Sequence, residues 1–202
     1  MKINKKIFFI FVIILFIILG IIIYKNMTKK SKYGNNINSQ EIVDNILNIN
    51  SYKSKITVQV NSNKNKNKYV VEQEYNTENG NIQTVLEPAN IAGIKIINNN
   101  NSLIVRNTKL NLSKIFEDYQ GLEDNSLDLI SFINNYKNFD KSKYEEKDIE
   151  IIMKTKNESN KQNTINKTLY INKETKLPTK MEIEDNNKNL KIFIQYNEIN
   201  IN

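Results

Sequence analysis

Apolar and polar residues alternate along most of the chain, and the exceptions are the N-terminus and three short segments. From Ser51 onward, runs such as SKITVQV are apolar at every second position. This is the period of a β-strand that buries one face. Similar runs recur between turns rich in asparagine and lysine. The pattern predicts about eight to ten strands, joined as consecutive hairpins.

Short sequence signals mark several of the turns. Asn79 and Gly80 form the Asn-Gly pair that is typical of a tight hairpin, and Pro88 closes the strand that follows. Residues 93–107 then predict a second hairpin around an asparagine turn. Near the C-terminus, an antiparallel series is predicted from four further runs: 147–156, 163–172, 178–185 and 190–199.

Two segments have helical periodicity instead. Residues 38–49 carry Ile42, Val43, Ile46 and Leu47 on one helical face, and residues 125–136 carry a second apolar face. A third segment, 110–119, predicts a short helix or loop. Helices do not alternate regularly with the strands, which argues against a parallel sheet. The predicted fold class is therefore α+β, a curved antiparallel sheet with helices on its concave face.

The N-terminus has an uncharged apolar run from Ile7 to Tyr24. This run is long enough to span a membrane, and it is longer than the apolar core of a cleaved signal peptide. We therefore expect a short tail (1–6), a transmembrane anchor (7–24), a polar linker (25–38) and a folded domain (39–202). The predicted anchor residues include Ile7, Phe8, Phe9, Phe11, Leu15, Phe16, Leu19 and Tyr24.

The net charge of +7 belongs to the anchor region and not to the domain. Seven of the 29 lysines and arginines lie in residues 1–32, which contain no acid, and this leaves 22 basic and 22 acidic residues in 33–202. A neutral domain without a basic stripe argues against nucleic-acid binding. Lysines flank both sides of the anchor, so the positive-inside rule is nearly balanced. The short N-terminal tail favours an extracytoplasmic domain on a single-pass membrane protein.

The chain contains no cysteine and no histidine. This excludes thiol nucleophiles, thiolate metal sites and the commonest general base. Three pairs of glutamates (72 and 74, 145 and 146, 182 and 184) lie among lysines, which favours solvated strand faces over a catalytic pair. We predict no enzymatic activity, no cofactor and no metal site.

Residues 168–199 form a strand, a polar turn ending in Leu177-Pro178, a second strand, a turn and a last strand. This order resembles the C-terminal hairpins of LolA-like proteins, and residues 75–107 match the earlier layout of that superfamily. Within it, the chain is similar to the GerS-type germination lipoproteins of endospore-forming bacteria. The resemblance covers about residues 39–202 and implies a half-barrel. GerS-type proteins carry a lipid-modified cysteine that this chain lacks, so Ile7–Tyr24 would provide the anchor.

The resemblance leaves two functions open. The relation to GerS implies a non-enzymatic accessory protein that binds and activates a cortex peptidoglycan amidase of the CwlD type, in support of spore germination. The relation to LolA implies a protein that binds a lipid or lipoprotein in the concave face. Bulky side chains packed across that face, such as Phe116, Phe132 and Phe193, would favour the first function. An open apolar pocket of at least about 300 Å³ would favour the second.

The strand YVVEQEY is the predicted partner contact. It carries Tyr69, Val71, Gln73 and Tyr75 on one face and further apolar residues on the other. Such a strand is either buried on both sides or covered by another chain. Arg106, the single arginine, is added as a candidate contact because its planar guanidinium can bind a carboxylate or phosphate. A homodimer is kept as a further form of assembly.

Overall fold

The computed structural model describes residues 38–62, 65–99, 102–117, 127–157, 164–187 and 190–202. Residues 39–202 form one compact unit. The predicted tail, the anchor and nearly all of the linker, residues 1–37, lie outside the described residues. Within the part of the chain that is described, no helix is long and apolar enough to cross a membrane. The transmembrane anchor therefore stays a prediction.

The described residues form eleven strands and two helices. In chain order they are α2 (Ser39–Leu47), β1 (Ser51–Ser62), β2 (Lys66–Asn76), β3 (Gly80–Glu87), β4 (Ile94–Asn99), β5 (Ser102–Asn107), β6 (Leu112–Glu117), α3 (Leu129–Asn138), β7 (Lys143–Lys147), β8 (Glu150–Asn157), β9 (Ile165–Asn172), β10 (Pro178–Asp185) and β11 (Leu190–Ile201).

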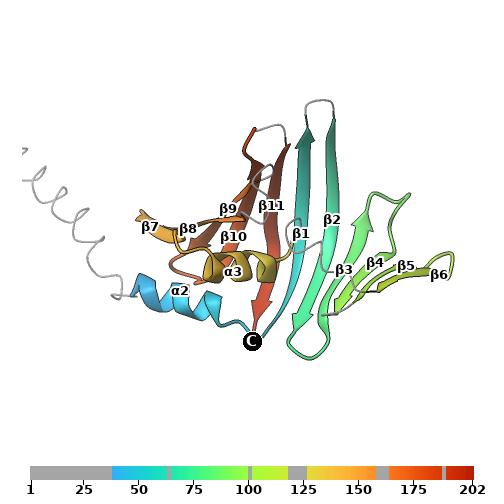
Figure 1. Ribbon diagram of the computed structural model, residues 1–202, viewed down its shortest axis with the longest axis horizontal. Helices are drawn as coiled ribbons and strands as arrows, with labels where there is room; N and C mark the ends of the chain where they lie inside the picture. The colour runs from blue at the N-terminus through green and yellow to red at the C-terminus, as the bar shows by residue number, and fades with distance from the viewer. Residues whose placement is uncertain (1–37, 63–64, 100–101, 118–126, 158–163, 188–189) are drawn as a thin grey trace, which may run out of the picture. The chain divides into compact units, whose positions relative to one another are not determined.

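All eleven strands belong to one sheet, in the order β6-β5-β4-β3-β2-β1-β11-β10-β9-β8-β7. Each strand pairs with its neighbour in the antiparallel direction, and almost every neighbour is also the next strand in sequence. The exception is β1, which pairs with the last strand, β11. This pairing joins two meanders, β1–β6 and β7–β11, into one sheet whose edges are β6 and β7 (Figure 1).

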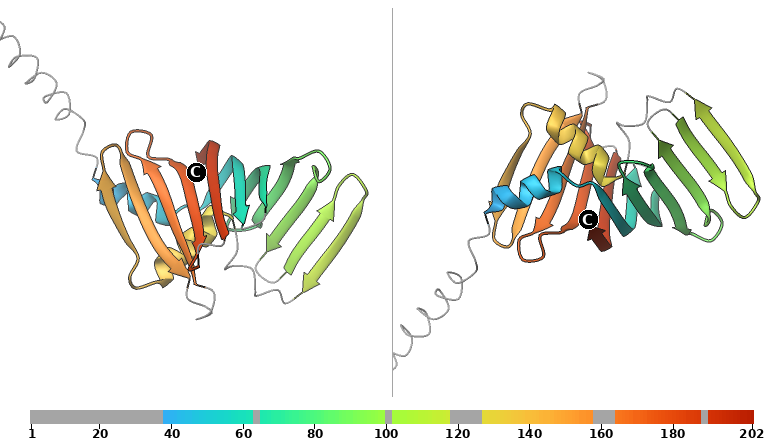
Figure 2. Two further views of the ribbon diagram at one scale, coloured as in Figure 1. Left: turned by 90° about the horizontal axis from the view of Figure 1, so that it is seen from above. Right: turned by 90° about the horizontal axis from the view of Figure 1, so that it is seen from below.

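Both helices lie on the same face of the sheet, over β1 and β7–β11 (Figure 2). We call this the helix-bearing face and its reverse the open face. No described helix covers strands β3–β6, and we call this four-stranded part, Gly80–Glu117, the wing. The predicted α+β class, with a curved antiparallel sheet and helices on one face, is confirmed.

The core lies between the helices and the sheet. In α2, Ile42, Val43 and Ile46 are buried, as the helical period predicts. In α3, Leu129 and Phe132 are fully buried. The sheet contributes alternate residues from its central strands: Ile56, Val58, Ile151, Met153, Leu169, Ile171, Met181, Ile183 and Ile194. The period of two therefore identified the inward positions correctly.

Two predicted segments are wrong. Residues 112–117 form strand β6 instead of a short helix or loop, because β5 supplies a partner for every residue from Leu112 to Glu117. The short strand β7 was not predicted, since its sequence KYEEK is almost entirely charged. It pairs with β8 at the edge of the sheet, where charged side chains remain in solvent and protect the edge from unwanted pairing.

Candidate functional site

A group of polar side chains is buried between the sheet and the start of α3. The group draws on five strands, β1, β2, β3, β9 and β11, and on the helix with its N-cap. Its members, called the buried polar cluster below, are Tyr52, Ser54, Gln73, Asn81, Asp128, Ser131, Lys167 and Tyr196.

Asp128 and Lys167 are the charged members of this cluster. Asp128 is the N-cap of α3, and its Oδ1 accepts a hydrogen bond of 2.6 Å from the backbone N–H of Ser131. The hydroxyl oxygen of Ser131 accepts a bond of 2.7 Å from Nζ of Lys167, whose side chain is only 1% exposed. Burial raises the pKa of Asp128, and the Ser131 N–H, the charge of Lys167 and the amide of Asn81 oppose that rise. A lysine of β9 thus helps to fix the first turn of α3.

Strands β1 and β2 hold the same helix end through neutral groups. The amide of Gln73 donates to the Leu127 carbonyl at 3.4 Å, and its oxygen accepts from Ser54 at 3.4 Å. The Tyr52 hydroxyl accepts a bond of 3.3 Å from the backbone N–H of Leu129. Burial raises the pKa of Tyr52 well above its usual value, so its hydroxyl stays neutral. These hydrogen bonds hold the start of α3 against strands β1 and β2.

Two buried oxygens of the cluster, Asn81 Oδ1 and the Tyr196 hydroxyl, have no hydrogen-bond partner among the described residues. Burial also raises the pKa of Tyr196. Buried polar atoms are usually paired. We have no physical account of these two.

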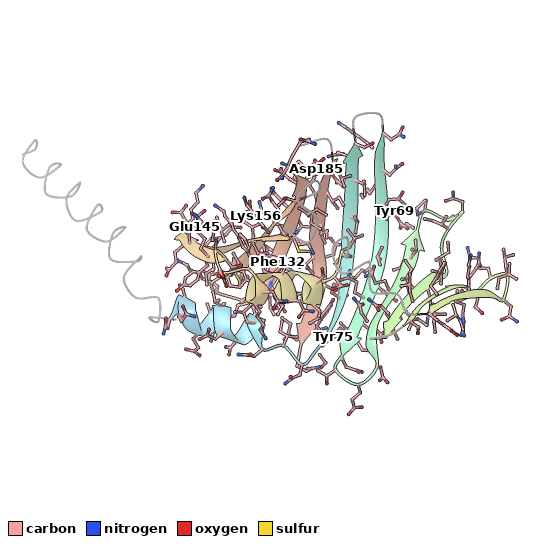
Figure 3. All side chains as sticks on the ribbon, in the orientation of Figure 1. Tyr69, Tyr75, Phe132, Glu145, Lys156 and Asp185 are labelled. Carbon is pink, nitrogen blue, oxygen red and sulfur yellow. The ribbon has the colours of Figure 1, made fainter. Side chains whose placement is uncertain are left out.

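The structure places the predicted contact residues in two different regions. Tyr69 and Tyr75 lie at opposite ends of β2, half-buried (Figure 3). Val71 and Gln73 lie between them and are buried, and Tyr75 stacks on Tyr52 with ring centroids 5.9 Å apart. The four residues share the helix-bearing face, so they support the core around the start of α3. A direct contact between this strand and a partner stays a prediction.

Arg106 lies apart from these residues. It is exposed on β5, in the wing. Residues that pair across neighbouring strands lie on the same face of the sheet. Asn98 pairs with Asn81, which shares the face of Gln73, and also with Leu103, so the odd-numbered residues of β5 lie on that face too. Arg106 has an even number and therefore lies on the open face. The structure therefore separates Arg106 from the four residues of β2.

Sequence reasoning missed Asp128 and Lys167. A detectable signal existed for each. Asp128 immediately precedes an apolar-periodic segment, which is typical of a helix N-cap. Lys167 occupies the same phase as Leu169 and Ile171, so the alternation placed it inward although its charge suggests a surface position.

The paired glutamates are bound by lysines. Glu145 and Glu146 contact Lys154 and Lys173 respectively, and these hydrogen bonds lower the pKa of both carboxyl groups. Glu182 and Glu184 lie beside Lys191 in the same way. A general acid needs a raised pKa, so these shifts are in the opposite direction. The described residues also contain no group of acidic side chains that could hold a metal ion.

The three phenylalanines that distinguish the two functions lie in different places. Phe132 is fully buried between α3 and the sheet, 5.9 Å from the ring centre of Tyr136 (Figure 3). Phe193 lies on the open face beneath Lys191, and Phe116 lies on the edge strand β6. Because Phe116 pairs with Leu103, it also lies on the helix-bearing face, but at the edge of the wing, so Phe132 is the one of the three that is fully buried against the sheet.

A hollow of about 410 Å³ lies where β1 and β2 end. Ser51, Lys53, Glu74, Asn76 and Asn79 contribute to its lining. Tyr52, Tyr75 and Ile82 also line it, so the hollow is of mixed polar and apolar character and does not by itself distinguish the two functions.

The wing has little of the burial seen in the other half of the sheet. Leu103 is buried, whereas large apolar side chains near the edge are exposed: Leu110 by 65%, Leu112 by 63% and Ile115 by 57%. Leu112 and Ile115 lie on opposite faces of β6, and Ile149, in the turn between β7 and β8, is exposed by 58% outside the wing. Scattered exposed apolar residues are ordinary, but the wing carries most of the large ones in the described structure and is a candidate interaction site.

A family model for sporulation proteins described as YdcC-like matches residues 5–202. The chain belongs to the YdcC-like family of sporulation proteins. No curated protein matches this YdcC-like chain.

Two solved structures are similar to the YdcC-like chain. A chain from the complex of the CwlD amidase with the GerS lipoprotein, both of Clostridioides difficile, is 23% identical, with 82% of this chain and 94% of that chain covered and a TM-score of 0.50. A LolA superfamily protein from Nitrosomonas europaea is 13% identical, with coverage of 81% and 93% and a TM-score of 0.45. The family match confirms the predicted kinship with sporulation proteins, and the first structure shows that the fold is shared with a chain of the CwlD–GerS complex.

The buried polar cluster predicts unequal effects for two lysine substitutions. Lys167→Met leaves the Asp128 carboxylate buried without its nearby cation, so the free energy of unfolding should fall by about 3–5 kcal/mol. Lys173→Met removes a partly exposed contact with Glu146 and should change it by about 0–1 kcal/mol. Denaturant unfolding of the full chain measures both. Equal effects would show that Lys167 contributes only its packing.

Asp128 also predicts a pH dependence. Its pKa is raised in the folded state, so the folded chain takes up this proton before the unfolded chain as the pH falls. Wild type should therefore gain stability relative to Asp128→Asn as the pH falls through the raised pKa toward 3.8. Asparagine keeps the N-cap acceptor. Denaturant unfolding across this window measures the difference.

Glu145→Gln is the control for this series. The pKa of Glu145 is lowered, so its contribution is lost on acidification and the trend has the opposite sign. A difference between wild type and Asp128→Asn that does not change with pH would contradict the raised pKa.

Proposed function

We propose that the chain is a non-enzymatic accessory protein that binds and activates a cortex peptidoglycan amidase of the CwlD type during sporulation. The observation that carries this proposal is membership of the YdcC-like sporulation family together with the fold shared with a chain of the CwlD–GerS complex. The proposed activity is contact: the domain holds the amidase in an active form and supports the muramic-lactam modification on which germination depends.

The geometry is consistent with action by contact. Five of the six glutamates that could have formed a catalytic pair lie beside lysines, and the pKa values of Glu145 and Glu146 are lowered. Among the described residues, three of the four large exposed apolar side chains, Leu110, Leu112 and Ile115, lie in the wing, which no described helix covers. A rigid sheet with one uncovered half can present a fixed surface to a second protein.

The packing of α3 favours a protein partner over a lipid. An acyl chain in the helix-bearing face would have to displace Phe132 and Leu129 of α3, which are fully buried.

 The start of α3 is also fixed by Asp128, Gln73 and Tyr52, so its removal would break several hydrogen bonds at once. We therefore place lipid binding second.

We further propose that Ile7–Tyr24 anchors the protein in the membrane, with residues 39–202 outside the cytoplasm. An apolar run of this length supports a retained single span. Alkaline carbonate extraction of membranes tests the anchor, because an integral protein stays in the pellet. Release of the full-length chain into the supernatant would contradict it.

The central experiment combines binding and activity. The purified full chain, in detergent, is mixed with the CwlD-type amidase of the same organism, and calorimetry measures the affinity. Hydrolysis of cortex peptidoglycan is then measured with and without the chain. We expect a saturable complex and a rise in amidase activity that follows complex formation.

Lipid extraction and mass spectrometry of the same preparation test the second function. A stoichiometric bound lipid, with no amidase complex, would contradict the proposed function and support the lipid-binding one. An amidase complex without any increase in hydrolysis would retain binding but overturn activation.

A further inference from the structure

A row of four isoleucines crosses the open face of the wing. Ile82 pairs with Ile97, Ile97 with Ile104, and Ile104 with Ile115, so the four form a continuous line from β3 to the edge strand β6. We call this line the isoleucine row. Ile115, at its outer end, is 57% exposed, and the other three are half-buried. Directly paired apolar side chains give a continuous apolar strip.

Two positive charges lie beside this row. Lys95 and Arg106 are Cα partners on β4 and β5, and we call them the basic pair. The same cross-strand row continues with Thr84 on β3 and Ser113 on β6, and its nearest acid is Glu72 on β2, two strands away from Lys95. Among the described residues, neither member of the basic pair is in a salt bridge. Like charges placed directly opposite each other destabilise a sheet.

In the other half of the open face, on β9–β11, the lysines have partners within the domain. Lys191 contacts both Glu182 and Glu184, and Lys180 lies near Glu182 and 3.8 Å from the ring centre of Tyr170. Lysines on that half therefore have carboxylate and aromatic neighbours within the domain. The basic pair has no such carboxylate in the described structure, so a carboxylate from another molecule would relieve its repulsion.

We propose that the isoleucine row and the basic pair form the docking surface for a protein partner that presents an apolar strip with a carboxylate beside it. This inference rests on the proposed function and names the surface on which the amidase binds. The apolar strip of the partner covers the isoleucine row, and its carboxylate accepts hydrogen bonds from the guanidinium of Arg106 and the ammonium of Lys95.

The charges around the row favour a protein over an anionic membrane. Glu117 lies on the open face two residues beyond Ile115, on the side of the row opposite the basic pair. Glu74 pairs with Ile82 and extends the row onto β2. Anionic headgroups spread over this surface would meet both acids. A protein can instead place one acid at the basic pair and avoid the others.

Charge reversal tests the surface with a matched control. Lys95→Glu/Arg106→Glu reverses the basic pair. Lys66→Glu/Lys68→Glu makes the same change in net charge at two exposed lysines of β2, on the open face outside the wing. Calorimetry with the full chain and the CwlD-type amidase measures affinity at two salt concentrations. Thermal unfolding of each variant confirms that it is folded.

We expect the reversal of the basic pair to weaken binding by about tenfold or more, and to remove most of its salt dependence. The control should stay within about threefold of wild type. If wild type binds and both variants bind equally well, the docking surface is wrong and the proposed function stands. If wild type itself does not bind, the proposed function fails and this inference fails with it.

A label at Ser113 distinguishes a membrane surface. The chain has no cysteine, so Ser113→Cys carries a single fluorophore beside the basic pair. The labelled full chain is reconstituted in vesicles of phosphatidylcholine and phosphatidylglycerol that contain a lipid-bound quencher. Fluorescence that changes only when the amidase is added supports the proposal. Quenching by the lipid alone, abolished by reversal of the basic pair, would assign the surface to the membrane and overturn it.

Discussion

The structure depends on the pairing of its first strand with its last. Tyr52 to Ser62 of β1 pair with Leu190 to Ile201 of β11, and these are the only neighbouring strands in the described sheet that are distant in sequence. Backbone hydrogen bonds in both directions between Ser51 and Asn202 complete the junction. Without this long-range pairing, the two meanders would be separate sheets, and the helices would have no common surface to cover. Such non-local pairing also has a high entropic cost of loop closure.

The second constraint is the return of the chain from one edge of the sheet to the other. Strands β6 and β7 are opposite edges of the sheet, and α3, which lies between them in the chain, packs on the helix-bearing face. The buried polar cluster determines where α3 begins, because Asp128, Gln73 and Tyr52 all bond to its first turn or to the residue before it. Buried polar contacts of this kind add positional specificity where apolar packing alone would allow a helix to slide.

The local pattern predicted most of the fold, and long-range contacts account for the errors. Alternation identified the inward positions Ile56 and Val58 of β1 and the segments that form β8–β11, and the helical period identified α2 and α3. It failed for β6, where the strand is defined by its pairing with β5 and its own residues are compatible with other structures. The candidate site was harder to predict. Gln73 was assigned to the correct face, but a single sequence does not show that α3 covers it, and the partners of Asp128 and Lys167 come from distant segments.

The wing is built from hairpins in which each strand contacts its sequence neighbours. The β1–β11 junction lies outside it, and among the members of the buried polar cluster only Asn81, on β3, belongs to it. A protein of this architecture can therefore lengthen, shorten or remodel strands β4–β6 without disturbing the residues that keep it folded. Divergence among relatives should then concentrate in this extension, so that an ancestral scaffold acquires new binding preferences while its folding remains the same.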